Sequence, residues 1–310
     1  MMLRRPLLAL ARSRRLGRMA AGMPVTSGIV SRFVAGESIE AAVAVVERLH
    51  AGGLTVTLDH LGEDTRDRAA AEANRDAYLT LLARLADAGL TPAAEVSVKL
   101  SAIGQALPGD GPALATDNAA AICAAAEAAA TTVTLDMEDH TTTDATLGTV
   151  HQLRVHFPWV AAVLQAYLRR TEGDCRDLAG AGSRVRLCKG AYDEPASVAF
   201  TSRADVDRSY VRCLRILMSG EGYPMVATHD PRLVEIAGTL ALANGRAPGS
   251  YEFQMLYGVR PAEQARLVAA GETVRVYVPY GDQWFGYLAR RLAERPANLG
   301  FALRSIMTRS

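Results

Sequence analysis

Eight short runs with β-strand character recur along the chain at nearly regular intervals. They are rich in aliphatic and β-branched residues, and segments with helical periodicity separate them. From Leu54 to Val274 their mean spacing is about 31 residues, which is typical of a strand–helix unit. The runs are Leu54–Asp59, Glu95–Leu100, Thr132–Asp136, Val160–Tyr167, Arg184–Lys189, Pro224–His229, Tyr251–Leu256 and Val274–Pro279. Eight alternating units without a long linker favour one closed α/β structure, a TIM-like (βα)8 barrel.

The segments between these runs carry the signals that start and end helices. The helices expected over Glu37–His50 and Asp64–Ala88 both stop at glycine, and prolines open two later helices. The alanine-rich segment Thr116–Ala130 is expected to begin at its own Thr-Asp cap. An open doubly wound sheet is the alternative fold. Its usual glycine-rich loop follows a strand, whereas the cluster Gly180-Ala181-Gly182 precedes one.

Composition and charge exclude several classes of protein. The chain has 310 residues, of which 49% are hydrophobic and 22% charged, so it can bury a large core. Its first 36 residues hold seven arginines and no acid, which leaves the remainder with a net charge of about −6. That sign argues against a nucleic-acid partner. Four cysteines without a CxxC pair favour a reducing compartment, and no apolar run has membrane-span length. We therefore expect a cytoplasmic protein.

The arginine-rich start is expected to form a short basic amphipathic helix over Met1–Ala21. Three interpretations stay open: an arm packed on the body, attachment of that arm to the inner face of the cell membrane, or a cleaved mitochondrial presequence. The expected division is an N-terminal helical arm over residues 1–53 and the barrel over residues 54–310.

Polar residues gather at the ends of the predicted strands. In a (βα)8 barrel the carboxyl ends of the strands form the active site, and buried polar groups are costly unless they have partners. Packing alone explains such a set poorly. Its members are Lys99, Asp136, Glu138, Asp139, His140, Gln165, Arg186, Lys189, His229, Asp230, Glu252 and Tyr277.

Lys99 alternates with apolar neighbours, so it is expected to share the barrel-facing side with Ser97 and Ser101. We expect Asp136, one strand away, to be its partner; the pair is either functional or a structural ion pair. Arg186 offers a planar fork suited to an anionic or electron-rich ligand, and Lys189 suits phosphate, although a solvated loop end would account for both.

Two other readings of these residues are weaker. The acids and histidines hold enough ligands for a metal, yet no HxH or HExxH spacing occurs, so no metal is expected. His229 fits a general base, a ligand contact or a histidine that merely satisfies a strand end.

The segment after the last strand predicts a helix with one functional face. Tyr287, Arg290, Arg291 and Glu294 fall at i, i+3, i+4 and i+7. Adjacent arginines on one face would bind a carboxylate bidentately, and Glu294 would steady one of them. An ordinary solvated helix has the same spacing. These residues thus indicate a barrel enzyme for a small carboxylate but not the reaction.

The same segments resemble the monofunctional bacterial proline dehydrogenases over essentially the whole chain. Eight blocks occur in order: VSVKLSAIG (96–104), TLDMEDH (134–140), LQAYLRR (164–170), RLCKGAY (186–192), ATHD (227–230), EFQMLYG (252–258), VYVPYG (276–281) and YLARRLAE (287–294). The resemblance implies a distorted (βα)8 barrel that binds FAD. It also implies oxidation of L-proline to 1-pyrroline-5-carboxylate by hydride transfer to flavin N5, the first step of proline catabolism to glutamate, with electrons passed to a membrane quinone.

The resemblance also implies roles for individual residues. Asp136 and Arg186 would act in catalysis, Arg186 beside the flavin ring and Asp136 in support of Lys99. The substrate-binding residues would be Lys99, Tyr277, Tyr287, Arg290 and Arg291, with Glu294 as their support. The remaining cofactor-binding residues would be Met137, Gln165, Lys189, Gly190, Ala191, Thr228 and His229. A separate pyrroline-5-carboxylate/glutamate-semialdehyde dehydrogenase would use the product.

Two rival functions remain. A Schiff-base aldolase using Lys99 or Lys189 would be colourless and trappable with borohydride. A non-catalytic flavin-binding barrel would hold a flavin that proline does not reduce.

Overall fold

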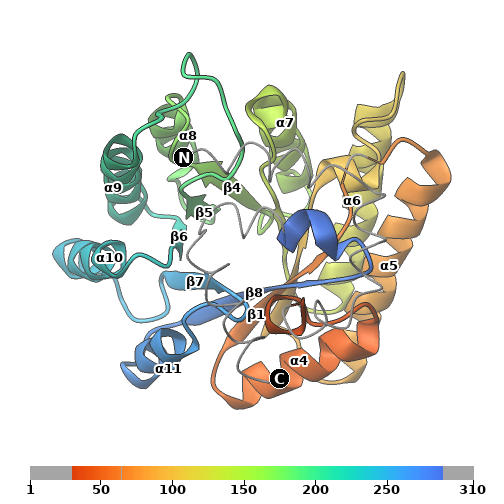
Figure 1. The fold of residues 1–310 in the computed structure, drawn as a ribbon, viewed down its shortest axis with the longest axis horizontal. Coiled ribbons are helices and arrows are strands. Elements are labelled where there is room, and N and C mark those ends of the chain that lie inside the picture. The colour runs from red at the N-terminus through yellow and green to blue at the C-terminus, as the bar shows by residue number, and fades with distance from the viewer. Residues whose placement is uncertain (1–29, 64, 289–310) are drawn as a thin grey trace, which may run out of the picture.

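The computed structural model describes residues 30–63 and 65–288, and these form a closed barrel of parallel strands inside a ring of helices (Figure 1). Each strand pairs with its neighbours in chain order, and β8 closes the ring on β1. The strands are β1 Thr55–His60, β2 Ala94–Val98, β3 Val133–Leu135, β4 Ala161–Gln165, β5 Arg184–Cys188, β6 Tyr223–Ala227, β7 Glu252–Leu256 and β8 Val274–Tyr280. The predicted (βα)8 barrel is confirmed, and the doubly wound sheet is excluded.

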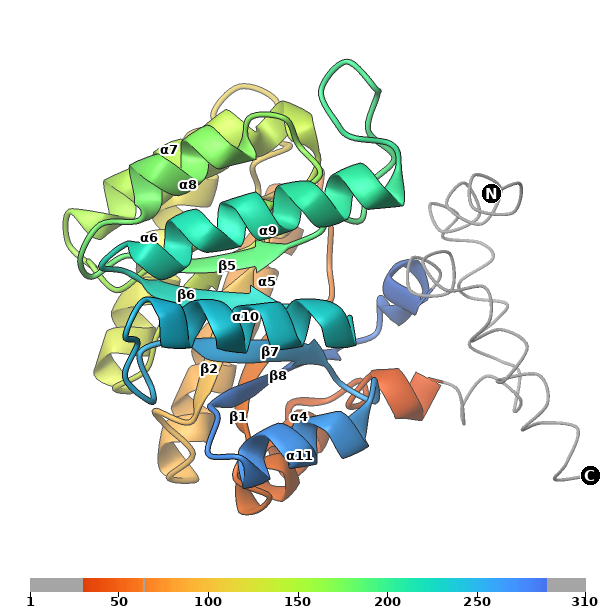
Figure 2. The ribbon, with the colours of Figure 1, turned by 90° about the vertical axis from the view of Figure 1, so that its left-hand side faces the viewer.

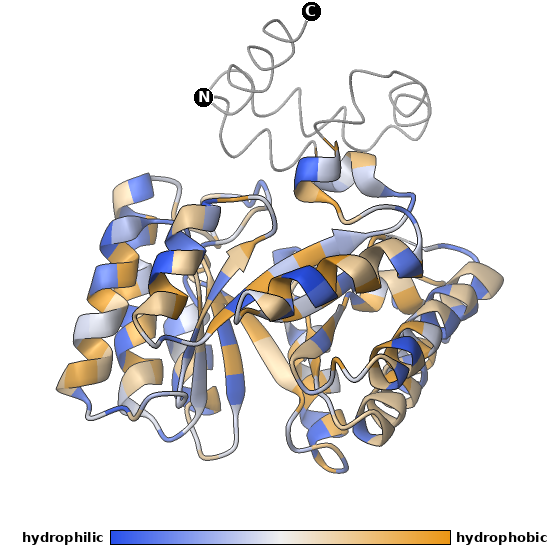
Figure 3. Ribbon diagram, turned by 90° about the horizontal axis from the view of Figure 1, so that it is seen from below, coloured by the Kyte–Doolittle hydropathy of each residue, from blue (hydrophilic) through white to orange (hydrophobic). Residues whose placement is uncertain are grey.

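Helices alternate with the strands and run along their outer side (Figure 2). They are α4 Ile39–Ala51, α5 Arg68–Asp87, α6 Gly111–Ala128, α7 Thr143–Arg154, α8 Thr171–Leu178, α9 Arg203–Ser219, α10 Pro231–Ala243 and α11 Pro261–Ala269, with the short 3-10 helices η1 Leu100–Ile103 and η2 His140–Thr142. These helices alternate between hydrophilic and hydrophobic residues, because one face covers the strands and the other meets water (Figure 3).

The main core lies between the strands and the inner faces of these helices. Val56, Leu58, Val96 and Val98 are essentially inaccessible to solvent and belong to this cluster. Alternate residues of the same strands point into the barrel and are polar, such as Thr57, Glu95 and Ser97. The barrel interior is therefore a polar, hydrogen-bonded network, and the aliphatic core surrounds it.

Helix α6 begins earlier than the sequence pattern predicts. It starts at Gly111 with Pro112 in its first turn, rather than at Thr116. The Thr116 hydroxyl instead donates a hydrogen bond to the Pro112 carbonyl within the helix. Proline suits the first helical turn because its missing N–H has no partner there in any case. The cap predicted at Thr116-Asp117 is therefore wrong.

The two ends of the chain bear on the other expectations. The predicted basic helix at Met1–Ala21 lies outside the described residues, as do Arg290, Arg291 and Glu294. Helix α4 buries Ala42, Val45 and Val46 in the main core. Within the described ranges, no helix is both long and apolar enough to cross a membrane.

Candidate active site

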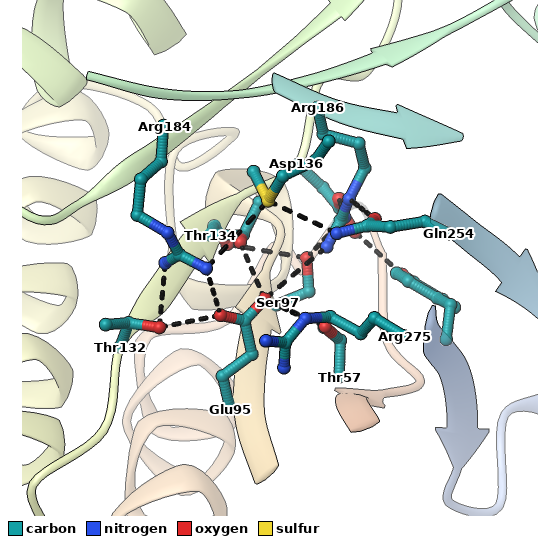
Figure 4. A network of polar contacts seen from close by, with 12 residues as sticks. Thr57, Glu95, Ser97, Thr132, Thr134, Asp136, Arg184, Arg186, Gln254 and Arg275 are labelled. Atoms are coloured by element: carbon teal, nitrogen blue, oxygen red, sulfur yellow. Dashed lines mark hydrogen bonds and ion pairs between the residues drawn. The ribbon is translucent and has the colours of Figure 1, made fainter. Parts of the chain in front are cut away.

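Arg186 occupies the centre of the barrel near the carboxyl ends of the strands. It comes from β5, is 4% exposed, and reaches three other strands or their ends (Figure 4). Its Nε donates to Gln254 Oε1 at 2.6 Å, and its Nη1 donates to Asp136 Oδ1 at 2.7 Å and Ser97 Oγ at 3.1 Å. The hydrogen bonds from Nε and Nη1 to three acceptors fix the orientation of the guanidinium.

Tyr277 and Asp136 continue this arrangement towards β8. The Tyr277 hydroxyl donates to Asp136 Oδ2 at 2.7 Å, and the Arg186 guanidinium carbon lies 5.3 Å from the centre of the Tyr277 ring. Burial first, and then the Asp136 charge, raise the pKa of Tyr277 well above its ordinary value. The phenol therefore stays protonated and keeps donating to the carboxylate, which fixes the ring.

Lys99 lies just beyond β2, and its ammonium Nζ is 2.6 Å from Asp59 Oδ2. The predicted pairing with Asp136 is therefore wrong at the level of contact. Both Asp136 oxygens are already engaged by Arg186 and Tyr277, whereas Asp59, at the end of neighbouring β1, faces Lys99. The predicted barrel-facing side of Lys99 is confirmed, since its ammonium contacts Asp59 at the end of the adjacent strand β1.

Lys99 stays charged although it is buried. Burial disfavours the ammonium, but the negative charges of Asp59 and Asp136 outweigh that cost and raise the pKa of Lys99. A permanent cation at the mouth of the barrel can bind a carboxylate. A Schiff-base lysine needs the opposite, a lowered pKa, so the environment of Lys99 disfavours the aldolase reading.

Gln165, the last residue of β4, has a side-chain oxygen that is available to accept a hydrogen bond. Its Nε2 donates to the carbonyls of Met137 at 3.2 Å and Glu138 at 2.7 Å. Its Oε1 is buried and, among the described residues, has no hydrogen-bond partner. A buried carbonyl oxygen held in place by its own amide is suited to accept an N–H from a planar ligand.

Lys189 and Gly190 follow β5 and form a shaped backbone segment. The Lys189 ammonium contacts Asp207 Oδ1 at 2.5 Å and Asp230 Oδ2 at 3.3 Å. Gly190 has φ +106°, and a Cβ there would overlap the Tyr167 ring, so only glycine fits. Ala191 continues this half-buried segment.

His229 and Thr228 lie just beyond β6, and both serve the backbone. His229 Nε2 accepts the Leu256 N–H at 2.9 Å, and Thr228 Oγ1 accepts the Asp230 N–H at 3.2 Å. The Nε2 atom of His229 is therefore not available to a general base, whereas the interpretations as a ligand contact and as a histidine that satisfies a strand end both stay open.

The predicted metal alternative gains no support from these contacts. In residues 30–63 and 65–288 there is no group of three or more ligating side chains. Glu138, a member of the suggested set, accepts hydrogen bonds from both the backbone N–H and the hydroxyl of Ser101.

Tyr287 is the only residue of the predicted C-terminal face that lies within the described ranges. It is buried in a small cluster with Val34, Leu61, Trp284 and Leu288. These residues follow the helical turn before α4, follow β1, or belong to the helical turn at 284–288, so Tyr287 is buried where these three segments meet.

Sequence reasoning missed two residues that the geometry brings into the site. Asp59 ends the first predicted strand, so the rule that located Lys99 could have found it as well. Gln254 stands mid-strand between Phe253 and Met255, and period-two alternation would have placed it inside the barrel. Its contact with Arg186 spans 68 residues and has no local signal.

Comparisons with known proteins agree with this geometry. The model of the family "Proline dehydrogenase" matches residues 42–304. The chain is 41% identical to a proline dehydrogenase of Deinococcus radiodurans over 90% of both chains. It is 37% identical to proline dehydrogenase 2 of Bacillus subtilis strain 168, over 96% of this chain and 97% of that one.

Solved structures of similar fold come from a longer protein. Proline utilization A from Bdellovibrio bacteriovorus, inactivated by N-propargylglycine, superimposes with a TM-score of 0.78 at 26% identity. The match covers 86% of this chain and 32% of that one, so this chain corresponds to about a third of it. On the family model and the near full-length relatives together, the chain belongs to the proline dehydrogenase family.

Proposed function

We propose that the protein oxidises L-proline to 1-pyrroline-5-carboxylate with FAD as its cofactor, the first step of proline catabolism to glutamate. One observation carries the proposal. Two buried cations, Lys99 and Arg186, flank the mouth of the barrel, each is held by its own carboxylate, and the Tyr277 ring lies against one of them. The named activity of the relatives is the reaction that such a site suits.

The residues fit a flavin. The buried Gln165 Oε1 needs a donor, and Arg186 Nη2 is buried without a hydrogen-bond partner among the described residues. The Gly190 segment lets the backbone approach a ligand closely. We propose that Met137, Gln165 and Arg186 contact the ring system, that Lys189, Gly190 and Ala191 hold the phosphates, and that Thr228 and His229 complete the contacts.

When bound, FAD supplies an acceptor for the hydride that leaves the ring carbon next to the proline nitrogen. The protein's contribution is orientation and charge. We propose that Lys99, Arg290 and Arg291 bind the substrate carboxylate, and that Glu294 steadies the two arginines. Tyr277 and Tyr287 would line the proline ring. Arg186 would provide a fixed positive charge beside the cofactor. Asp136 accepts hydrogen bonds from both Arg186 and Tyr277 and so fixes their relative positions.

We further propose a membrane quinone as the electron acceptor and peripheral contact of a cytoplasmic protein with the inner face of the cell membrane. The basic residues at the start of the chain support attraction to an anionic surface. The product would pass to a separate pyrroline-5-carboxylate/glutamate-semialdehyde dehydrogenase, because oxidation of the product needs a different catalytic site.

Product analysis tests this proposal. The purified protein, supplied with FAD, L-proline and a soluble quinone analogue, is expected to form pyrroline-5-carboxylate and reduced quinone in equal amounts. Pyrrolidine should be oxidised far more slowly, because it lacks the carboxylate that Lys99 would bind. Equal rates with proline and pyrrolidine would contradict the assigned substrate site.

A further inference from the structure

The connection from β5 to α9 carries the proposed phosphate-binding segment and then projects as a long loop beyond the start of α9 (Figure 2). This loop comprises residues 189–199. Backbone hydrogen bonds to one neighbouring segment fix its two ends. The Tyr167 N–H donates to the Lys189 carbonyl at 2.9 Å, and the Arg169 N–H donates to the Val198 carbonyl at 2.9 Å. These contacts secure both ends of the loop but not its middle.

The middle of the loop is held by the side chain of Glu194. This side chain is only 3% exposed. Its Oε1 accepts the backbone N–H of His140 at 2.9 Å and the Tyr167 hydroxyl at 3.2 Å, and its Oε2 contacts His140 Nδ1. Burying a carboxylate is costly unless donors surround it, so a loop residue with three such contacts is fixed firmly.

His140 belongs to the opposite part of the proposed cofactor site. It stands two residues after Glu138, and the carbonyls of Met137 and Glu138 accept hydrogen bonds from the amide of Gln165. Glu194 therefore joins two segments that are distant in sequence: the loop after β5, with the proposed phosphate contacts, and the segment after β3, with the proposed ring contacts.

We propose that Glu194 is a positioning residue that latches the loop of residues 189–199 to the segment at His140 and so keeps the two halves of the cofactor site at a fixed separation. The inference rests on the proposed binding of FAD. If Glu194 already orders the loop before FAD binds, less of the binding free energy of FAD is needed to order it. Loss of the Glu194 contacts should therefore weaken FAD binding and leave the binding of proline unchanged.

The test compares FAD-loaded full-length proteins: wild type, Glu194→Ala, Glu194→Gln and the control Ser197→Ala, which changes an exposed residue of the same loop. The rate of FAD release after dilution is followed by flavin fluorescence. We expect Glu194→Ala to release FAD roughly 10- to 100-fold faster, the range for loss of hydrogen bonds to a charged group. Glu194→Gln keeps an oxygen acceptor for His140 and Tyr167 and should recover most of the retention, while Ser197→Ala should match wild type.

Two further readouts separate a latch from a general structural role. With saturating FAD, the kcat and KM for proline of Glu194→Ala should stay within about twofold of wild type, because Glu194 touches neither reacting group. If Glu194→Ala does not fold, His140→Ala removes only the contact between the His140 imidazole and Glu194 Oε2. This variant should also release FAD faster than wild type.

Release of FAD from Glu194→Ala at the wild-type rate would overturn the proposal, and so would a loss that Glu194→Gln fails to restore. A wild-type protein that binds no FAD would instead contradict the proposed function. In that case hydrogen exchange still decides the latch: amides of residues 189–199 must exchange faster in Glu194→Ala than in wild type.

Discussion

Arg186 shows at the scale of one residue how the barrel fixes a charge. Its Nε and Nη1 donate hydrogen bonds to Gln254, Asp136 and Ser97, which come from three different strands or their ends. A lysine would keep the charge but could not satisfy these three acceptors in one plane.

Arg186→Lys is therefore expected to lower kcat by about 100-fold, the typical effect of a misplaced catalytic group. Arg184→Lys is the matched control. Arg184 lies two residues earlier on the same strand, at its amino-terminal end, and binds Glu95 and Thr132 instead of Asp136 and Gln254. Steady-state kinetics should show near-normal kcat for Arg184→Lys, and a similar kcat for both variants would refute this reading of Arg186.

Glu138 gives a pH-dependent prediction. Burial raises the pKa of Glu138 to about 7, against the hydrogen bonds from Ser101 that favour its charged form. In the unfolded chain the same group titrates near its ordinary value of about 4.5. Between these two values the folded state binds more protons than the unfolded state, so stability falls as the pH rises through this window, by about 3 kcal/mol in all.

Glu138→Gln removes this titration. Urea denaturation at pH 5 and pH 8 should show a smaller loss of stability for Glu138→Gln than for wild type, and the exposed Glu127→Gln serves as the control for one lost carboxylate. Parallel stability curves for wild type and Glu138→Gln would show that the burial of Glu138 has no such effect.

At the scale of elements, the sequence predicts at which strand end a polar residue lies. It does not predict which side chain that residue contacts. Lys99, Asp136 and Arg186 were predicted at strand ends because strand runs are local patterns. Lys99 pairs with Asp59, and Asp136 pairs with Arg186. This choice depends on how far each side chain extends inside the barrel, which the local pattern does not give. Glu194 was not singled out, because its contacts with His140 and Tyr167 span 54 and 27 residues in a loop without periodicity.

Gly190 offers a test of the loop that joins β5 to α9. Gly190→Ala should be destabilised by both its positive φ and the overlap with the Tyr167 ring, whereas Gly89→Ala shares the positive φ but has open space around it. We expect Gly190→Ala to lose about 1–3 kcal/mol more than Gly89→Ala, the usual cost of overpacking. Denaturant titrations of the two variants measure this difference, and equal losses would mean that the Tyr167 ring moves aside freely.

At the scale of the whole molecule, a buried ionic network joins strands on opposite sides of the barrel. Glu95 of β2 lies 2.8 Å from Arg184 of β5 and accepts hydrogen bonds from Thr57 and Thr132, and Arg275 of β8 is 3.8 Å away (Figure 4). Although burial opposes ionisation, Arg275 and Arg184 hold the pKa of Glu95 well below its usual range.

Glu95→Gln is expected to cost about 3–5 kcal/mol at neutral pH, because it leaves Arg184 without its counter-charge, whereas Arg275 keeps Glu252. The depressed pKa means that this stability is present above the ordinary carboxyl pKa and is lost as the pH falls. The gap between wild type and Glu95→Gln in thermal or urea unfolding should therefore narrow in acid. The exposed Glu221→Gln is the control, and a constant gap would exclude the ionic explanation.

An anaerobic visible spectrum of the FAD-loaded protein, recorded before and after L-proline is added, measures whether proline reduces a flavin bound in this barrel. The yellow flavin absorbance is expected to bleach when proline is added. A yellow protein that proline leaves unchanged would contradict the assigned substrate and favour a flavin-binding barrel without this activity.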